Sequence, residues 1–214
     1  MRLFESAVFL GTSIELGADT RPQRLRDLRD AMHPTCPYYR FLYELGKQFG
    51  PLDVIEIGTY VGTSAAHFAE SGGDVITIDI NPDAKRQVDA LGYPNIVAMT
   101  GDSLRVIEKP FSERYDVLYI DGLHNFSQAH REYFHYRQLV REGGLMIFDD
   151  VNLEMDGDEM NVLWDAIPEP KHRLDHLHTT TGFGIVEKTR MSVTDPATAY
   201  DLAAPIIKSR QRRA

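Results

Sequence analysis

The sequence has a single cysteine, little excess basic charge and no long hydrophobic run. Cys36 alone cannot form an internal disulfide, which is typical of a reducing compartment. With 23 Lys and Arg residues against 32 Asp and Glu residues, the formal net charge of -9 excludes a large basic surface for nucleic acid. No segment approaches the roughly 20 apolar residues of a membrane-spanning helix. We therefore predict a cytoplasmic protein with no nucleic-acid or membrane partner.

The two ends of the chain carry weak signals. The apolar patch at 7–10 is too short for the core of a signal peptide and has no cleavage site of small residues after it, so we predict no secretion signal. A basic cluster lies at the other end, at Lys208, Arg210, Arg212 and Arg213. We interpret it as a solvated tail, with a binding arm as the alternative.

Between the ends, short runs rich in Val and Ile alternate with helical segments. The runs that predict strands are 53–57, 74–80, 95–99, 115–121 and 145–150. The segments that predict helices are 62–71, 83–91, 103–107 and 127–140, the last ending before Gly143 and Gly144. This order predicts an α/β fold in which one mostly parallel, Rossmann-like sheet carries helices on both faces.

Three further segments complete the expected organisation. Residues 1–50 form an N-terminal helical segment, residues 51–190 the Rossmann-like core and residues 191–214 a loosely attached helix and tail. In the first segment, Tyr38, Leu42 and Leu45 fall at helical spacing, which indicates core packing, with a lid over the site as the alternative.

The end of the core segment has its own pattern. After a predicted helix at 158–167, the β-like runs 172–180 and 182–188 are joined by a short stretch around Gly182. Such a joint favours an antiparallel pair at one edge of the sheet.

The stretch VIEIGTYVGTSAAHFA, residues 54–69, passes from a strand into a glycine-containing turn and then a helix. Gly58 and Gly62 permit close approach of a ligand to the backbone, and in open α/β sheets ligands bind at such turns. A dinucleotide fingerprint would have a middle glycine where Tyr60 stands, and the carboxylate of Glu56 would repel a pyrophosphate. The turn therefore predicts a cofactor that lacks phosphates and carries positive charge.

Polar residues also follow the next two strands. Asp79 ends the second strand, where a carboxylate can accept hydrogen bonds from two ribose hydroxyls. In GDS at 101–103, Asp102 could accept from an adenine amino group and the Ser103 amide could donate to a ring nitrogen. The alternative for Asp79 is a turn residue or helix cap.

Together the motifs EIGTYVGTSA, TIDI, GDS, YIDG and FDDV resemble those of class I S-adenosylmethionine-dependent methyltransferases. They are most similar to the metal-dependent O-methyltransferase branch, the catechol and caffeoyl-coenzyme-A type with its sugar-modifying and other small-molecule relatives. The resemblance covers residues 42–152 and implies a seven-stranded sheet with an antiparallel last strand. It also implies an S-adenosylmethionine site formed by Glu56, Gly58, Thr59, Tyr60, Gly62, Ser64, Asp79, Ile80, Asp102, Ser103 and Asp121.

Three carboxylates end the fourth and fifth strands, Asp121 on one and Asp149 with Asp150 on the other. Neighbouring strands lie about 5 Å apart, so these side chains could converge, and they would repel one another unless a cation joined them. A hard ion such as Mg²⁺ fits oxygen ligands of this kind. The alternative is that Asp121 only orders the cofactor and the other two cap a loop. The resemblance assigns all three as metal ligands, with Asp150 where catechol enzymes carry asparagine.

His124 lies three residues after Asp121 and is the candidate general base. The resembling catechol and caffeoyl enzymes have a lysine at this spacing, whereas an imidazole accepts a proton at neutral pH without a large shift in pKa. The alternative is a helix cap or a solvent-exposed residue. We expect His130 and His135 on the surface of the same helix.

These features predict a methyltransferase that acts on a hydroxyl of a small molecule, such as a phenol, a catechol or a sugar. The acceptor pocket is expected from residues 154–159 and the N-terminal helices. A non-catalytic nucleoside-binding module and a nicotinamide-dependent oxidoreductase are the alternatives, and a homo-oligomer is left open.

Overall fold

The structure is a computed structural model that describes residues 2–14, 18–32, 37–106, 115–155 and 158–190. Cys36, Ile107 and the C-terminal segment with its basic cluster lie outside the described residues.

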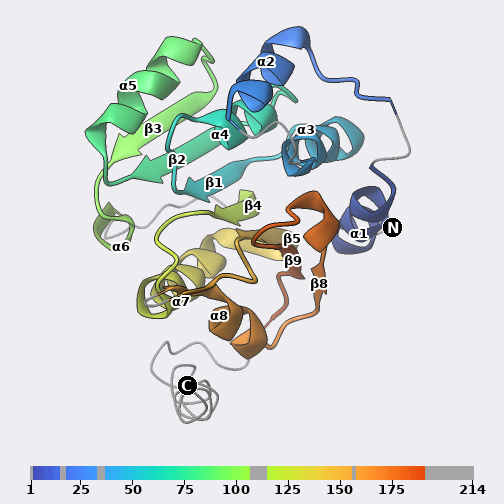
Figure 1. The fold of residues 1–214 in the computed structure, drawn as a ribbon, viewed down its shortest axis with the longest axis vertical. Helices are drawn as coiled ribbons and strands as arrows, with labels where there is room; N and C mark the ends of the chain where they lie inside the picture. Colours follow the sequence, from blue (N-terminus) through green and yellow to red (C-terminus); the bar gives the residue numbers. More distant parts are fainter. Residues whose placement is uncertain (1, 15–17, 33–36, 107–114, 156–157, 191–214) are drawn as a thin grey trace.

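A seven-stranded sheet forms the centre of the molecule (Figure 1). Its strands, in spatial order, are β3 (Ile96–Thr100), β2 (Val75–Asp79), β1 (Val54–Ile57), β4 (Tyr115–Ile120), β5 (Val140–Asp149), β9 (Phe183–Glu187) and β8 (Lys171–Arg173). The first five are parallel, and β9 runs antiparallel to both of its neighbours. The predicted fold class, a mostly parallel α/β sheet whose last strand in the chain is antiparallel, is confirmed.

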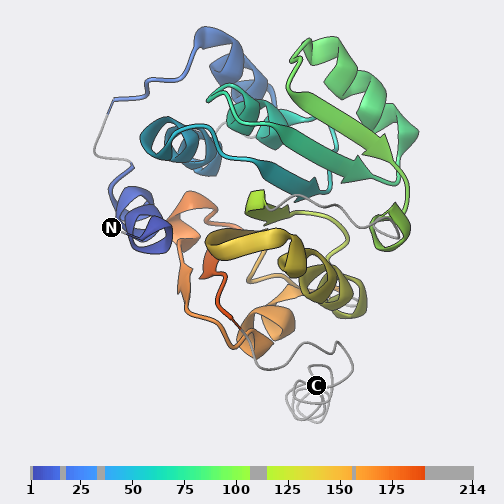
Figure 2. The same ribbon diagram turned by 180° about the vertical axis from the view of Figure 1, so that it is seen from behind.

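Helices cover both faces of this sheet (Figures 1 and 2). They are α1 (Leu3–Ser13), α2 (Gln23–Met32), α3 (Tyr38–Phe49), α4 (Thr63–Ala69), α5 (Pro82–Leu91), α6 (Ser103–Val106), α7 (Phe126–Tyr136) and α8 (Met160–Ala166). Helices α1, α3 and α4 contribute to one apolar cluster against the sheet, and α7 and α8 to another. The strands that carry the site are therefore covered on both faces.

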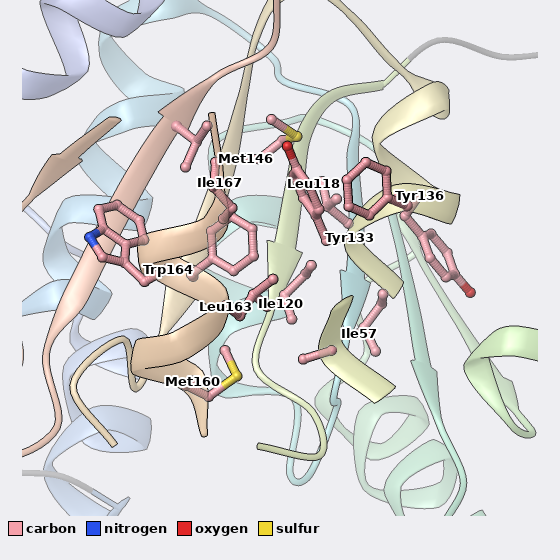
Figure 3. Close-up of a cluster of buried hydrophobic side chains, with 14 of the residues drawn as sticks. Ile57, Leu118, Ile120, Tyr133, Tyr136, Met146, Met160, Leu163, Trp164 and Ile167 are labelled. Atoms are coloured by element: carbon pink, nitrogen blue, oxygen red, sulfur yellow. The ribbon is translucent and has the colours of Figure 1, made fainter. Parts of the chain in front are cut away.

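The cluster beneath α7 and α8 is shown in Figure 3. Ile57 and Ile120, which end β1 and β4, contact apolar side chains such as Tyr133 of α7 and Leu163 of α8. All four side chains are at most 3% exposed. Because close-packed protein interiors have low compressibility, this cluster holds in place the strand ends at which the loops of the site begin.

Caps begin the two helices that open near those strand ends. Asn81 accepts a hydrogen bond from the Asp83 amide at the start of α5, and Pro82 occupies the first turn, where its missing N–H costs nothing. Asn125 accepts from the Gln128 amide at the start of α7. These caps set the positions of the loops that follow β2 and β4.

The structure corrects the expectations for β5 and for the final strand pair. Strand β5 begins at Val140, before the two glycines rather than after them, and a bulge shifts its register between Tyr115–Val140 and Val117–Leu145. The run 172–180 continues as a strand only to Arg173 and then forms a 3-10 turn at Asp175–Leu177. Leu174 and Leu177 are both fully buried, so the chain turns inward and the joint to β9 is longer than predicted.

Helix α1 lies within the expected N-terminal helical segment, and its Ala7 is fully buried. One further expectation is corrected. His130 lies in the core and not on the surface of its helix: it is 3% exposed and its ring lies 5.2 Å from that of Phe126 and 4.8 Å from that of Phe134. This burial lowers its pKa to about 4.

Candidate active site

A cavity of about 780 Å³ opens at the carboxyl ends of β1 to β5. Such ends are where open α/β sheets bind ligands. Most of the predicted site residues line it: Gly58, Thr59, Tyr60, Ser64, Asp79, Ile80, Asp102, Ser103, Asp121, Asp149 and Asp150. Three predicted residues, Glu56, Gly62 and His124, do not line it.

The turn after β1 is held by Asp79. One oxygen of its carboxylate accepts from the amides of Thr59 and Tyr60, both at 2.9 Å, and the other accepts from the Asn81 amide at 2.8 Å. At the start of the turn, Gly58 has φ +91°, and a Cβ there would lie 1.8 Å from the carbonyl oxygen of Asp121. Glycine is therefore required for the close approach between this turn and the one after β4.

Glu56 lies below the turn and not in the cavity. Its carboxylate is fully buried and accepts a hydrogen bond from the Ser64 hydroxyl in the first turn of α4. Burial raises the pKa of Glu56 to about 7, although the hydrogen bond from Ser64 acts in the opposite direction. Glu56 therefore contacts the helix that carries the turn, and its expected role toward the cofactor stays a prediction.

The cavity wall near β3 includes side chains from α7. The Ser103 hydroxyl donates to the carboxylate of Glu132. The side-chain amide nitrogen of Gln128 donates to Ser103 Oγ at 3.1 Å and to Glu132 Oε1 at 2.8 Å. Asp102 accepts from the Leu104 amide at 3.0 Å and so also starts α6. This end of the cavity offers hydrogen-bonding groups held in place by one another.

Two exposed apolar side chains lie on the cavity lining near these polar groups. Ile80, after β2, is 75% exposed and Leu123, after β4, is 63% exposed. Exposed apolar surface next to ordered polar groups is typical of a site for a flat, partly apolar ligand.

The carboxylates that follow β4 and β5 meet at one place. The Tyr119 hydroxyl lies 3.4 Å from Asp121 Oδ2 and 3.3 Å from Asp149 Oδ2. His178 Nδ1 lies 2.7 Å from Asp149 Oδ1, and His124 Nε2 lies 2.7 Å from Asp150 Oδ2. The sequence brings the three carboxylates together as expected, and each acid of β5 has an imidazole beside it.

The pKa values in this cluster follow from burial and charge. Burial, together with the negative charges of Asp149 and Asp150, raises the pKa of Asp121 well above its usual value. Burial also raises the pKa of Asp149, against the effect of its hydrogen bond with His178. For Asp150, burial acts upward, but hydrogen bonds with His124 and Thr181 lower the pKa overall. Two of the three carboxylates therefore carry their charge at a cost in this environment.

Two overlapping groups in this cluster could hold a metal ion. Asp121, His124 and Asp150 form one, and Asp149, Asp150 and His178 the other; within each group the donor atoms lie within 4.8 Å of one another. No lysine or arginine of the described residues lines the cavity. Even with both imidazoles protonated, three ionised carboxylates would leave negative charge that a cation could balance.

Several residues that line the cavity were not assigned to the site from the sequence, among them Tyr38, Tyr39, Gln128, Glu132, His178 and Thr181. The i,i+4 spacing of Gln128 and Glu132, one helical turn apart, was the available signal for that pair. His178 had none, because it lies in a run read as a strand.

Residues 154–159 contain the short pair β6 (Glu154–Met155) and β7 (Asp158–Glu159), and the Glu159 amide donates to the His124 carbonyl at 3.0 Å.

Comparisons with known proteins agree with this arrangement. Residues 55–151 match a family described as a methyltransferase domain, and no curated protein matches the chain by sequence. None of the helices in the described ranges has the length and apolar character to cross a membrane.

Several solved structures share the fold. A methyltransferase from Podospora anserina bound to S-adenosylhomocysteine has a TM-score of 0.64 and 13% identity, over 87% of this chain and 96% of its own. An O-methyltransferase from Streptomyces achromogenes involved in tomaymycin synthesis, in complex with S-adenosylmethionine, has a TM-score of 0.63 and 15% identity, over 85% and 96%. A Staphylococcus aureus protein assigned as a caffeoyl-CoA O-methyltransferase has a TM-score of 0.60 and 18% identity, over 86% and 99%. Residues 55–151 therefore match a methyltransferase domain, and the chain shares the fold of these solved methyltransferases.

Proposed function

We propose that the protein is a methyltransferase that moves the methyl group of S-adenosylmethionine to a hydroxyl group of a small molecule. The observation that carries the proposal is the single cavity that the turn after β1 and the carboxylate–histidine cluster both line. A donor held at the turn and an acceptor held at the cluster would meet within it, and such positioning supplies a large part of the rate of a displacement reaction.

The donor end suits a nucleoside with a cationic tail. We assign the adenine to the space between Ile80 and Leu123, with Asp102 and Ser103 at its edge, and the ribose to Asp79. The sulfonium and amino groups would lie toward the turn that Ser64 lines. Glu56, with its pKa near 7 beneath that turn, favours a cationic ligand, because positive charge nearby stabilises its ionised form.

At the acceptor end, Asp121, Asp149 and Asp150 are proposed to hold a divalent ion. The site fits such an ion, because these carboxylates and the imidazoles of His124 and His178 bring oxygen and nitrogen donors together. No lysine or arginine is among the described lining residues. When bound, the ion would supply Lewis acidity that lowers the pKa of an acceptor hydroxyl.

His124 is proposed to take the hydroxyl proton. Its side chain is 31% exposed beside the cavity, and Asp150, 2.7 Å away, would stabilise the imidazolium that results. The acceptor oxygen then attacks the methyl carbon in line, the carbon–sulfur bond breaks, and the electron pair stays on sulfur as neutral S-adenosylhomocysteine leaves. Tyr38 and Tyr39 on the cavity wall suit a flat or ring-shaped acceptor such as a phenol, a catechol or a sugar.

The test has two stages. Calorimetry with S-adenosylmethionine, S-adenosylhomocysteine and NAD should show binding of the first two alone. A methyl-transfer screen against phenols, sugars and glycosides, with and without divalent metal, should then give methyl ethers. Selective binding of NAD, or transfer only to nitrogen acceptors in a parallel amine panel, would contradict the proposal.

A further inference from the structure

Asp150 lies between two imidazoles. Its Oδ2 is 2.7 Å from His124 Nε2, and its Oδ1 is 3.9 Å from His178 Nδ1. Asp150 has φ +59°, in the left-handed region of backbone conformation that residues other than glycine adopt infrequently. Such strained positions persist where the surrounding structure imposes them and are frequent at functional sites.

His178 is held firmly toward the carboxylates. The residues before it are anchored by the fully buried side chains of Leu174 and Leu177. Its carbonyl accepts from the Gly182 amide at 2.8 Å, and its ring lies 5.2 Å from that of Tyr38. The imidazole is 14% exposed and lines the cavity, so its position is set before any ligand arrives.

The donor atoms of His178, Asp149 and Asp150 lie close together. His178 Nδ1 lies 2.7 Å from Asp149 Oδ1, and the three donor atoms lie within 4.8 Å of one another. We propose that His178 is a direct ligand of the divalent ion at Asp149 and Asp150, and that its nitrogen makes the site selective for Mn²⁺, Co²⁺ or Zn²⁺ over Mg²⁺. This inference rests on the metal of the proposed function and concerns which divalent ion the site takes.

The chemistry of the donors supports this selectivity. Mg²⁺ demands near-octahedral oxygen coordination and gives up its waters reluctantly, so an imidazole in place of an oxygen ligand weakens its binding. Among first-row divalent ions, Co²⁺ and Zn²⁺ accept imidazole nitrogen readily, and Mn²⁺ accepts it less strongly than they do, because affinity rises along the series toward copper. One histidine is thus sufficient to turn an oxygen site away from Mg²⁺.

The experiment uses the full chain and the metals alone. Mn²⁺ and Mg²⁺ are titrated by calorimetry into the metal-free wild type, into His178→Asn and into His172→Asn, an exposed histidine on β8 that serves as control. Asparagine keeps a polar group near the same position and offers oxygen in place of the ring nitrogen. We expect His178→Asn to weaken Mn²⁺ by about tenfold or more and Mg²⁺ by less than about threefold, with the control unchanged.

Pulsed electron paramagnetic resonance of bound Mn²⁺ gives a readout independent of affinity. The wild type should show coupling to an imidazole nitrogen, and His178→Asn should reduce or remove it. His124→Asn is measured beside it, because coupling that is lost in His124→Asn and undiminished in His178→Asn would overturn the proposal. Circular dichroism and S-adenosylhomocysteine affinity check that each variant is folded.

Failure of this inference and failure of the proposed function give different results. Methyl transfer to a hydroxyl together with Mn²⁺ that shows no coupling to His178 refutes the inference alone. Nitrogen-coupled Mn²⁺ at His178 together with no transfer to any hydroxyl refutes the proposed acceptor and leaves the metal site standing. Equal affinity for Mg²⁺ and Mn²⁺ in the wild type also overturns the inference.

Discussion

Gly62 and Gly92 have the same backbone conformation in opposite surroundings, so alanine at the two positions makes a matched pair. Gly62 caps the start of α4 at φ 80° and ψ 20°, and Gly92 ends α5 at φ 74° and ψ 22°. A Cβ at Gly62 would lie 2.7 Å from Val88 Cγ2 and 3.2 Å from Leu91 Cδ1, whereas nothing lies within 4 Å of one at Gly92. The pair separates the cost of the conformation from the cost of the contact.

The magnitudes follow from these two terms. Alanine in the left-handed region costs about 1 kcal/mol at either position. At Gly62 the methyl group must also displace Val88, which is 3% exposed, and overpacking of this kind costs about 1 to 3 kcal/mol more. We therefore expect Gly62→Ala to lower the free energy of unfolding by about 2 to 4 kcal/mol and Gly92→Ala by about 1 kcal/mol.

Urea unfolding of both variants measures this difference, and a third variant tests its cause. Val88→Ala should cost stability in the wild type through the cavity it leaves, but less in the Gly62→Ala background, where it makes room for the new methyl group. Because Gly62 precedes α4 and follows the turn that lines the cavity, Gly62→Ala should also weaken S-adenosylhomocysteine binding by about tenfold. Equal unfolding free energies for the two alanine variants would refute the reasoning, since the contact with α5 would then carry no cost.

Four other predictions concern the site and the core. Asp79→Ala should weaken S-adenosylhomocysteine binding by about 1 to 3 kcal/mol in calorimetry, because it removes the acceptor for two turn amides as well as the proposed ribose contact; unchanged affinity would remove it from the site. A chelator, or Asp149→Ala, should abolish methyl transfer and leave donor binding mostly intact, and full activity in excess chelator would show the cluster to be structural. His124→Ala should reduce turnover by about 10² to 10⁴ and remove the acidic limb of the pH–rate profile, whereas normal turnover with an unchanged profile would exclude it as the base. Burial lowers the pKa of His130 to about 4, so between pH 6.5 and 4 its imidazole binds a proton in the unfolded chain but not in the folded one. The free energy of unfolding should therefore fall by up to about 3 kcal/mol as the pH drops through that range. His130→Phe should flatten this pH dependence, and His172→Phe should not.

The strand ends could be predicted because parallel strands place their carboxyl ends on one edge of a sheet. Asp79, Asp102, Asp121 and Asp149 each follow such a strand, and all four line one cavity. The alternation of Val- and Ile-rich runs with helical segments was sufficient to predict the parallel strands, since strands that are buried on both faces have nearly continuous hydrophobic sequences.

His178 could not be predicted in the same way, because its position depends on the order of the strands. Strand β9 inserts between β5 and β8, and its first residue, Phe183, pairs with Asp149. The segment just before β9 therefore lies beside the end of β5, although it follows that strand by about thirty residues in the chain. A local pattern cannot report such a pairing, and Leu174 and Leu177 obscured it further by bending the run inward.

For Glu56, the place in the strand was predicted from the sequence, but the face of the sheet toward which its side chain points was not. Successive side chains of a strand point to opposite faces, and Ile57, the next residue, lines the cavity while Glu56 does not. Period two therefore sends the Glu56 side chain to the other face of the sheet, where Ser64 of α4 donates to its carboxylate. Any influence of Glu56 on a cationic donor then passes through the first turn of α4 and through charge alone. Glu56→Gln, which keeps an acceptor for Ser64, should for that reason weaken donor binding less than Asp79→Ala does in the same calorimetric titration.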